Sequence, residues 1–226
     1  MRMLVVAATE VETAPFVATL GAASTRGQRL SSHHRAGHQI DILITGVGMV
    51  ATAAWCSRAL VQTRYDLALN LGICGAFDRT LRPGQVVHVV SDRIAELGAE
   101  DGDRFITIQE LELVGEDDFP FTGGELVNAS PPANRALSEL RTVRGITVNT
   151  VHGLERSIAD VTQRFAPQVE TLEGAAFMYS CLIHGLAFAQ VRAVSNFVEP
   201  RNREAWKLDE AISSLGHTAL SILERS

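Results

Sequence analysis

The chain has 226 residues, of which 46% are hydrophobic and 20% charged, a composition typical of a folded globular protein with room for a substantial core. It carries 26 acidic and 20 basic residues without a run of lysine and arginine, and this formal net charge of −6 disfavours general binding to nucleic acid. No apolar stretch approaches the roughly 20 residues of a membrane-spanning helix, and Cys56, Cys74 and Cys181 lie far apart, which favours free thiols in the cytoplasm over a disulfide framework.

The first part of the chain is predicted to alternate between strands and helices. Residues 3–8 form a continuous apolar run, which is typical of a strand buried on both faces. Residues 10–20 place apolar side chains on one side and end before Gly21, which predicts a helix. The same reasoning predicts strands over 39–45, 66–71 and 85–90 and an alanine-rich helix over 49–63, with glycine loops at 46–48 and 72–75.

The segment 95–124 breaks this pattern. It is acidic, yet it contains apolar side chains that need burial, including Phe105, Phe119 and Phe121. We therefore expect a long excursion that acts as a lid rather than as a linker between domains.

The remaining residues are predicted to complete the same domain. The expected helices cover 131–143, 175–183 and 204–223, and the expected strands cover 145–151 and 185–194. Strands that alternate with helices predict the α/β class. We expect a single three-layer αβα domain over residues 1–226, with a mostly parallel, mixed central sheet.

Polar or glycine-rich segments follow several of the predicted strands. They lie at 9–12, 46–48, 72–75 and 195–203. In α/β sheets, ligands bind beyond the carboxyl ends of the strands. The sequence therefore predicts that these four segments converge on one site.

Common cofactor and metal motifs are missing. Gly46 and Gly48 precede a predicted helix, as in a dinucleotide-binding fingerprint, but Ala51 stands at the third glycine position. The seven histidines show no metal-binding spacing, and the adjacent His33 and His34 would point to opposite faces of a strand. We therefore expect neither a cofactor nor a metal ion.

Four motifs, taken together and in order, resemble the nucleoside phosphorylase and nucleosidase superfamily over nearly the whole chain. They are Ala-Ala-Thr-Glu-Val-Glu at 7–12, Asn-Leu-Gly-Ile-Cys-Gly at 70–75, Glu-Thr-Leu-Glu-Gly-Ala-Ala at 170–176 and Val-Arg-Ala-Val-Ser-Asn at 191–196. Within this superfamily the chain is most similar to the 5′-methylthioadenosine/S-adenosylhomocysteine nucleosidase branch. Segments 97–103 and 196–202 resemble the futalosine hydrolase family of menaquinone biosynthesis in particular. The resemblance implies a nucleoside phosphorylase-like fold and hydrolysis of the N-glycosidic bond of futalosine, with release of hypoxanthine.

The resemblance also implies roles for three residues. Glu12 matches the general base that activates water at the anomeric carbon. Glu173 matches the carboxylate that binds the ribose 2′ and 3′ hydroxyls, whereas Glu170 is expected to lie outside the site. Asn196 stands where adenine-cleaving nucleosidases have aspartate. An amide cannot act as an acid but can donate to a 6-oxo group, so a 6-oxopurine is the expected leaving base.

Hydrolysis is favoured over phosphorolysis by the residues around the expected anion site. Asn70 stands where the phosphorylases of the superfamily have arginine, and the carboxylate of Glu12 would repel phosphate. No cofactor would be needed for either reaction.

The expected binding pocket draws on further positions. We expect Phe77, Met49 and Trp206, with the 95–124 excursion, to surround the 5′ substituent, and Arg201, Arg203 or Lys207 to pair with its carboxylate. His152 is expected beside the purine. The complete set of expected substrate-binding residues is Glu173, Leu172, Gly75, Cys74, Phe77, Met49, His152, Ser195, Arg201 and Trp206.

Two alternatives to futalosine hydrolysis remain open from the sequence. One is a purine nucleosidase acting on inosine or on 5′-methylthioadenosine and S-adenosylhomocysteine, and the other is a non-catalytic nucleoside-binding protein. The only partners expected are a small nucleoside and further copies of this chain. Relatives are commonly homo-oligomers, so we favour a dimer, for which the helix over 49–63 with Trp55 and Val50 is one candidate surface.

Overall fold

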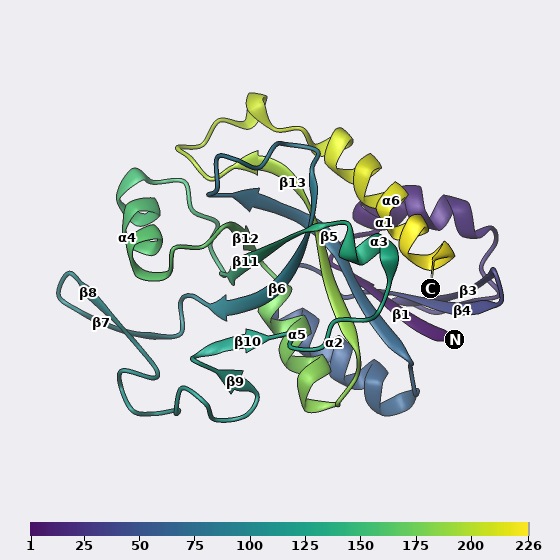
Figure 1. Cartoon of the computed structure of the whole chain (residues 1–226), viewed down its shortest axis with the longest axis horizontal. Coiled ribbons are helices and arrows are strands. Elements are labelled where there is room, and N and C mark those ends of the chain that lie inside the picture. The colour runs from purple at the N-terminus through teal and green to yellow at the C-terminus, as the bar shows by residue number, and fades with distance from the viewer. Residues whose placement is uncertain (226) are drawn as a thin grey trace.

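The structure of the chain is a computed structural model that describes residues 1–225, apart from the side chain of Arg26. Its centre is a mixed sheet of 11 strands (Figure 1). The middle of the sheet is parallel, with β1 (Arg2–Ala7) between β4 (His38–Ile44) and β5 (Leu67–Ala76), and with β13 (Phe188–Phe197) beside β5. These strands run in the same direction, so their carboxyl ends lie along one edge of the sheet.

The sheet continues on both sides of this parallel centre. On one side β6 (Val86–Ile94) pairs antiparallel with β13 and parallel with β11 (Arg141–Thr147). The strand β12 (Val169–Thr171) joins β11 to β5, lying parallel to the former and antiparallel to the latter. The outer strands are β2 (Thr25–Arg26), β3 (Leu30–Arg35), β9 (Phe121–Thr122) and β10 (Glu125–Val127).

Helices cover both faces of the sheet and give three layers (Figure 1). The helices α1 (Glu10–Leu20), α3 (Arg135–Ser138) and α6 (Leu208–Glu224) lie on one face, and α2 (Met49–Gln62) and α5 (Gly174–Ile183) lie on the other. The side chains of β1 alternate between these layers: Met3 and Val5 pack in the cluster under α1 and α6, and Leu4 and Val6 in the cluster under α2 and α5. The prediction of a first strand buried on both faces is therefore confirmed, as is the three-layer α/β fold.

The predicted helices over 10–20, 49–63, 175–183 and 204–223 are found as α1, α2, α5 and α6, the last beginning at Leu208 after the short 3₁₀ helix Arg203–Ala205. The helix predicted over 131–143 is wrong. Only α3 is helical there, and from Arg141 the chain enters β11, because the β-branched Thr142 and Val143 pair with β6 and Val143 is buried. The loop predicted at 72–75 is also wrong, since β5 continues to Ala76 with partners on both sides.

Several elements were not anticipated, among them β3, α4 (Glu155–Phe165) and β12. The excursion 95–124 contains a hairpin of β7 (Gly98–Asp101) and β8 (Arg104–Thr107), which projects from the sheet (Figure 1). This hairpin contacts α4, where Arg156 pairs with Asp103 at 2.6 Å and the guanidinium of Arg164 stacks 4.3 Å above the ring of Phe105.

Candidate active site

Glu12 is fixed at the junction of β1 and α1. Thr9 precedes the helix, and both its backbone N–H and its hydroxyl donate to Oε2 of Glu12, each at 2.9 Å. This is a capping box, which needs a glutamate or glutamine three residues after the capping threonine. Oε1 accepts a further hydrogen bond from the backbone N–H of Ile73 in β5 at 3.3 Å. The carboxylate is thus turned from α1 toward the end of the central strand.

Arg192 is the residue of the site to which the sequence analysis assigned no role. Its side chain is fully buried in β13, donates to Oδ1 of Asn70, and has no partner for Nε among the described residues. A Cβ on Gly72 would lie 2.2 Å from Nη1 of Arg192 and 3.0 Å from Oε1 of Glu12. Glycine at this position therefore allows the guanidinium and the carboxylate to approach β5. The signal in the sequence was the alternation of Gln190 and Arg192 in an otherwise apolar strand.

Glu173 lies directly before α5, opposite the start of α2. Its Oε1 accepts a hydrogen bond from the backbone N–H of Gly48 at 2.9 Å. Burial raises the pKa of Glu173; the positive charge of Arg192 and the Gly48 hydrogen bond oppose this shift, and the charge of Glu12 adds to it. The structure thus brings Glu12 and Glu173, which are far apart in the sequence, into one electrostatic environment around Arg192.

Asn196 lies near the end of β13, beside a small cavity of about 80 Å³. Its Oδ1 accepts a hydrogen bond from the hydroxyl of Ser195 at 2.7 Å, and its Nδ2 donates to the backbone carbonyl of Phe197 at 2.9 Å. The cavity is lined by Gly75, Val151, His152, Gly153, Glu170, Asn196, Phe197, Val198, Glu199, Arg201, Asn202 and Trp206. Five residues of the predicted site therefore surround one space: Gly75, His152, Asn196, Arg201 and Trp206.

The expectation that Glu170 lies outside the site is wrong. Because β12 runs antiparallel to β5, Glu170 stands opposite Gly75 and lines the same cavity as Asn196. Its Oε1 accepts from the backbone N–H of His152 at 3.0 Å and its Oε2 from Nδ1 of the same residue. The imidazole also meets the ring of Phe77 edge-on, with 6.2 Å between centroids.

The other predicted residues occupy more varied places. Cys74 is buried in β5, and its burial raises the pKa of the thiol to about 12, so it is not suited to act as a nucleophile. Its carbonyl lies 3.1 Å from the hydroxyl of Ser195. Leu172 and Phe77 pack against the small core cluster around Ile146, and Met49 is the first residue of α2, next to the Gly48 that contacts Glu173.

The segment 201–207 contacts the site through a backbone hydrogen bond. The N–H of Lys207 donates to the carbonyl of Ser195 at 2.8 Å. The guanidinium groups of Arg201 and Arg203 each lie 5.9 Å from the ring of Trp206. By contrast, the 95–124 excursion contributes no residue to the cavity beside Asn196, so its role as a lid stays a prediction.

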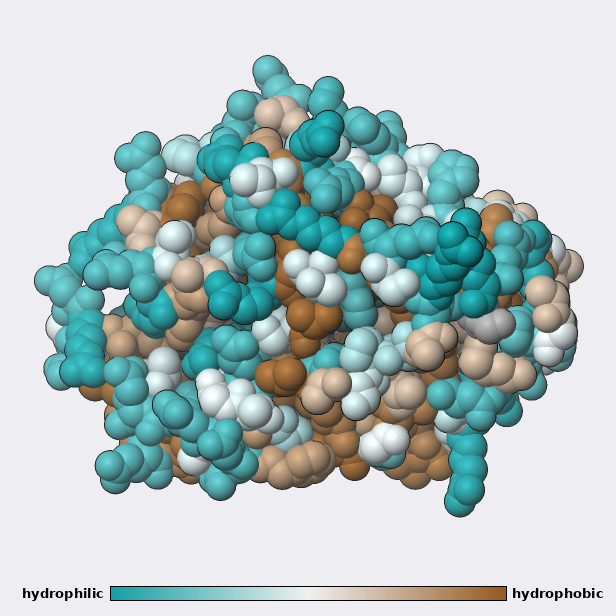
Figure 2. Space-filling model, in the orientation of Figure 1, coloured by the Kyte–Doolittle hydropathy of each residue, from teal (hydrophilic) through white to brown (hydrophobic). Residues whose placement is uncertain are grey.

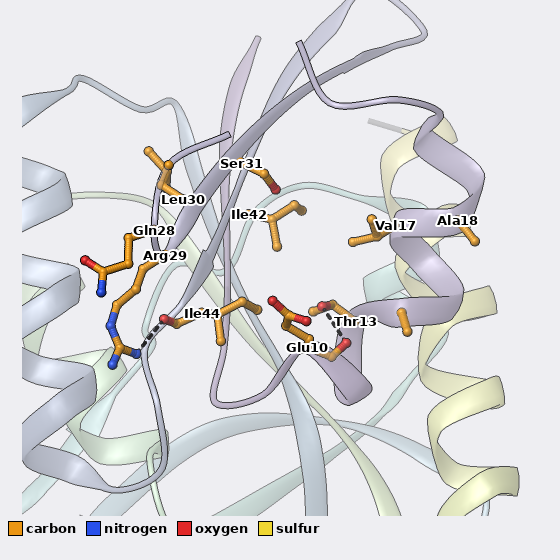
Figure 3. A pocket seen from close by; sticks show the side chains of 12 residues that line it. Glu10, Thr13, Val17, Ala18, Gln28, Arg29, Leu30, Ser31, Ile42 and Ile44 are labelled. Atoms are coloured by element: carbon orange, nitrogen blue, oxygen red, sulfur yellow. Dashed lines mark hydrogen bonds between the residues drawn. The ribbon is translucent and has the colours of Figure 1, made fainter. Parts of the chain in front are cut away.

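A larger cavity, of about 550 Å³, lies on the other side of α1 (Figure 3). Figure 3 shows Glu10 and Thr13 of α1 opposite Ile42 and Ile44 of β4, with Arg29 donating to the carbonyl of Ile44 at 3.2 Å. None of the predicted site residues lines this cavity. It is therefore separate from the site around Glu12, Arg192 and Glu173.

Within residues 1–225, no group of three or more histidine, cysteine, aspartate or glutamate side chains is placed to hold a metal ion. No helix in that range combines the length and apolar character required to cross a membrane.

Comparison with known proteins identifies the family of the chain. Residues 2–225 match the family model described as the phosphorylase superfamily. The chain belongs to this superfamily.

Individual relatives narrow the family further. The chain is 32% identical to a futalosine hydrolase of Streptomyces coelicolor, over 95% of this chain and 92% of that protein. It is 29% identical to a futalosine hydrolase of Thermus thermophilus, over 80% of each. Within the phosphorylase superfamily it therefore belongs to the futalosine hydrolase family. The fold is also that of the native futalosine hydrolase of Helicobacter pylori, with a TM-score of 0.82 and 12% identity over 100% of this chain and 98% of the other.

Proposed function

We propose that this chain hydrolyses the N-glycosidic bond of futalosine and releases hypoxanthine and dehypoxanthine futalosine, a step of menaquinone biosynthesis. The observation that carries the proposal is the pair of buried carboxylates, Glu12 and Glu173, which share one electrostatic environment with the buried Arg192. The membership of the futalosine hydrolase family supports the choice of substrate. The free thiols of the three buried cysteines suit a cytoplasmic enzyme.

The proposed reaction uses each carboxylate at a different part of the nucleoside. Glu12 accepts a proton from the attacking water, whose oxygen bonds to C1′ as the sugar acquires oxocarbenium character. Glu173 accepts hydrogen bonds from the 2′ and 3′ hydroxyls of ribose. The buried positive charge of Arg192 favours the ionised form of Glu173, and its guanidinium and the Glu12 carboxylate both lie close to Gly72.

Asn196 accounts for the proposed purine. Its amide N–H groups can donate to the 6-oxo oxygen of hypoxanthine, whereas an adenine amino group at the same place would face another donor. Adenine would then leave a buried polar group unpaired, so the site discriminates in favour of 6-oxopurines.

The proposal for the 5′ substituent centres on Arg201 and Trp206. Both line the cavity beside Asn196, and the Arg201 guanidinium carries no ion pair among the described residues. We expect it to meet the carboxylate of futalosine, with Trp206 beside the apolar part of the same substituent.

We further propose that the enzyme is a dimer whose partner sits on the start of α2. Val47 and Val50 are 60% and 83% exposed, and they flank Gly48 and Met49 at the edge of the site. In Figure 2, brown hydrophobic residues lie between teal hydrophilic ones and are most frequent along the middle and lower part of the viewed face. A second copy seated on the start of α2 would cover apolar surface and border the substrate pocket.

The test is purine release from futalosine, inosine and 5′-methylthioadenosine, each with and without phosphate, followed by chromatography of the free base. We expect rapid release of hypoxanthine from futalosine that does not depend on phosphate. Equal turnover of inosine would contradict recognition of the 5′ substituent, and a requirement for phosphate would contradict hydrolysis.

A further inference from the structure

The pair formed by His152 and Glu170 is the most unusual polar group beside the cavity. Glu170 is 4% exposed, and both of its oxygens accept hydrogen bonds from His152. Within residues 1–225 no lysine or arginine forms an ion pair with Glu170, and His152 is its sole charge partner. A buried carboxylate without a compensating charge is strongly disfavoured. His152 therefore supplies the hydrogen-bond donors that this buried carboxylate needs.

One ring nitrogen of His152 is left for a ligand. Nδ1 is held by Glu170, and the ring edge rests against Phe77. Nε2 has no hydrogen-bond partner among the described residues, and it is not enclosed by the protein. Because His152 lines the cavity together with Asn196, this nitrogen is available to whatever occupies the space.

The leaving purine needs a proton that Asn196 cannot supply. When the bond between C1′ and N9 breaks, its electron pair moves into the purine and leaves a negative charge there. An amide does not act as an acid, and the guanidinium of Arg201 does not release its proton at ordinary pH. Histidine is the side-chain type best suited to proton transfer near neutral pH, and His152 is the histidine in the cavity lining.

We propose that His152 is the proton donor to the departing purine and that Glu170 is the positioning residue that holds its imidazolium. This inference rests on the proposed function and adds a catalytic residue to it. The proton moves from Nε2 to the purine edge that carries N7 and the 6-oxo oxygen, while Asn196 binds the same edge. Glu12 takes one proton from water and His152 gives one proton to the purine, so the net reaction is the addition of one water molecule. Solvent then returns the proton from Glu12 to His152.

A purely structural role for the pair makes a different prediction. The hydrogen bonds to Glu170 also tie the backbone at His152 to β12. If that were their whole purpose, removing the imidazole would disturb all substrates alike. The two roles can therefore be distinguished by whether the loss of activity on removing the imidazole depends on the leaving group.

The experiment compares His152→Gln and Glu170→Gln with the parent enzyme on futalosine and on N7-methylated futalosine. The methylated purine already carries a positive charge and departs as a neutral base without gaining a proton. We expect kcat for futalosine to fall about 100-fold or more in His152→Gln, the usual range for loss of a general acid, and kcat for the methylated substrate to fall less than about threefold. Glu170→Gln should lower kcat for futalosine by about tenfold, with little change in KM and with the same preference for the methylated substrate.

Matched controls and a second readout complete the test. His184→Gln and Glu139→Gln alter exposed residues outside the cavity and should retain parent activity. Added imidazole should raise kcat of His152→Ala on futalosine at least tenfold. If the parent enzyme does not cleave the methylated substrate, this rescue by itself tests the role of His152. Equal losses on both substrates without rescue by imidazole would overturn the role of His152. A parent enzyme that releases no hypoxanthine from futalosine would instead overturn the proposed function, and this inference with it.

Discussion

Two glutamates in the first turn of α1 face different surroundings. Glu12 is buried and bridges Thr9 to Ile73, whereas Glu10 is exposed and borders the larger cavity of Figure 3. The spacing of two residues on a helix turns their side chains to different sides. Glu10 is therefore a suitable control for the proposed role of Glu12 as the general base.

Glu12→Gln should reduce kcat for hypoxanthine release by about 10²- to 10⁴-fold, because the amide cannot accept the proton of water. Glutamine can still close the capping box, so the melting temperature should change little. Stopped assays of purine release and thermal melts monitor the two effects. Glu10→Gln should behave like the parent enzyme, and an active Glu12→Gln would show that another group activates the water.

Asn196→Asp should weaken the preference for 6-oxopurines. A carboxylate beside the 6-oxo oxygen loses the N–H donor and leaves an acceptor facing an acceptor, at a cost of about 1–3 kcal/mol, or roughly 5- to 160-fold in kcat/KM. The measurement is the ratio of kcat/KM for futalosine to that for its 6-amino analogue. A ratio identical to that of the parent enzyme would refute the assigned role of Asn196.

At the scale of elements, the start of α5 is held in place by polar contacts with the sheet. The hydroxyl of Thr147 in β11 accepts from the backbone N–H of Ala175 at 2.8 Å and donates to Asp92 in β6 at 2.9 Å. Asp92 also accepts from Nε2 of Gln190 at 3.0 Å. This network fixes the position of Glu173, which directly precedes α5.

Asp92 gives this network a dependence on pH. Burial raises the pKa of Asp92 to about 6, so the folded state holds its proton at pH values where the unfolded chain has released it. Its contribution to stability is therefore complete below about pH 4 and is lost as the pH rises through about 6, by an amount of up to about 3 kcal/mol. Asp92→Asn should abolish this loss. The measurement is the free energy of unfolding in urea at pH 4 and at pH 7, for the variant and for the parent. The exposed Asp101→Asn should retain the parent's pH dependence, and equal slopes for parent and Asp92→Asn would contradict the assignment.

The elements that the sequence predicted well are those whose hydrophobic pattern is set by local geometry. The run at 3–8 and the helices found as α1 and α5 needed no knowledge of their neighbours. By contrast, β12 has three residues and exists because β11 and β5 flank it. Such a short strand has no pattern of its own, which is why the place of Glu170 was missed.

At the scale of the whole molecule, the parallel strands bring their carboxyl ends together along one edge of the sheet (Figure 1). The site combines residues from β5, β12 and β13 with the starts of α1, α2 and α5. The start of α2 borders this site and carries exposed valines, so assembly and activity should be coupled.

Val50→Asp should convert a dimer into a monomer and lower activity, because a charge replaces an apolar contact in the interface. Sedimentation equilibrium gives the mass, and purine release at matched concentrations gives the activity. Leu113→Asp, which charges another exposed apolar residue in the 95–124 segment, is the matched control. A Val50→Asp variant with the parent's mass would place the interface elsewhere, and a monomeric parent would refute the dimer.

The sequence by itself determined the α/β class and the family and predicted the two carboxylates of the proposed site, because hydrophobic periodicity and contiguous motifs are local properties of the chain. It also exposed the change at Asn196, which is visible in a single motif. The tertiary structure alone decided that the buried Arg192 shares an electrostatic environment with Glu12 and Glu173, and that Glu170 holds His152 beside the cavity lined by Asn196. These contacts join residues from strands that are distant in sequence, and their charges acquire meaning only when burial removes the water around them.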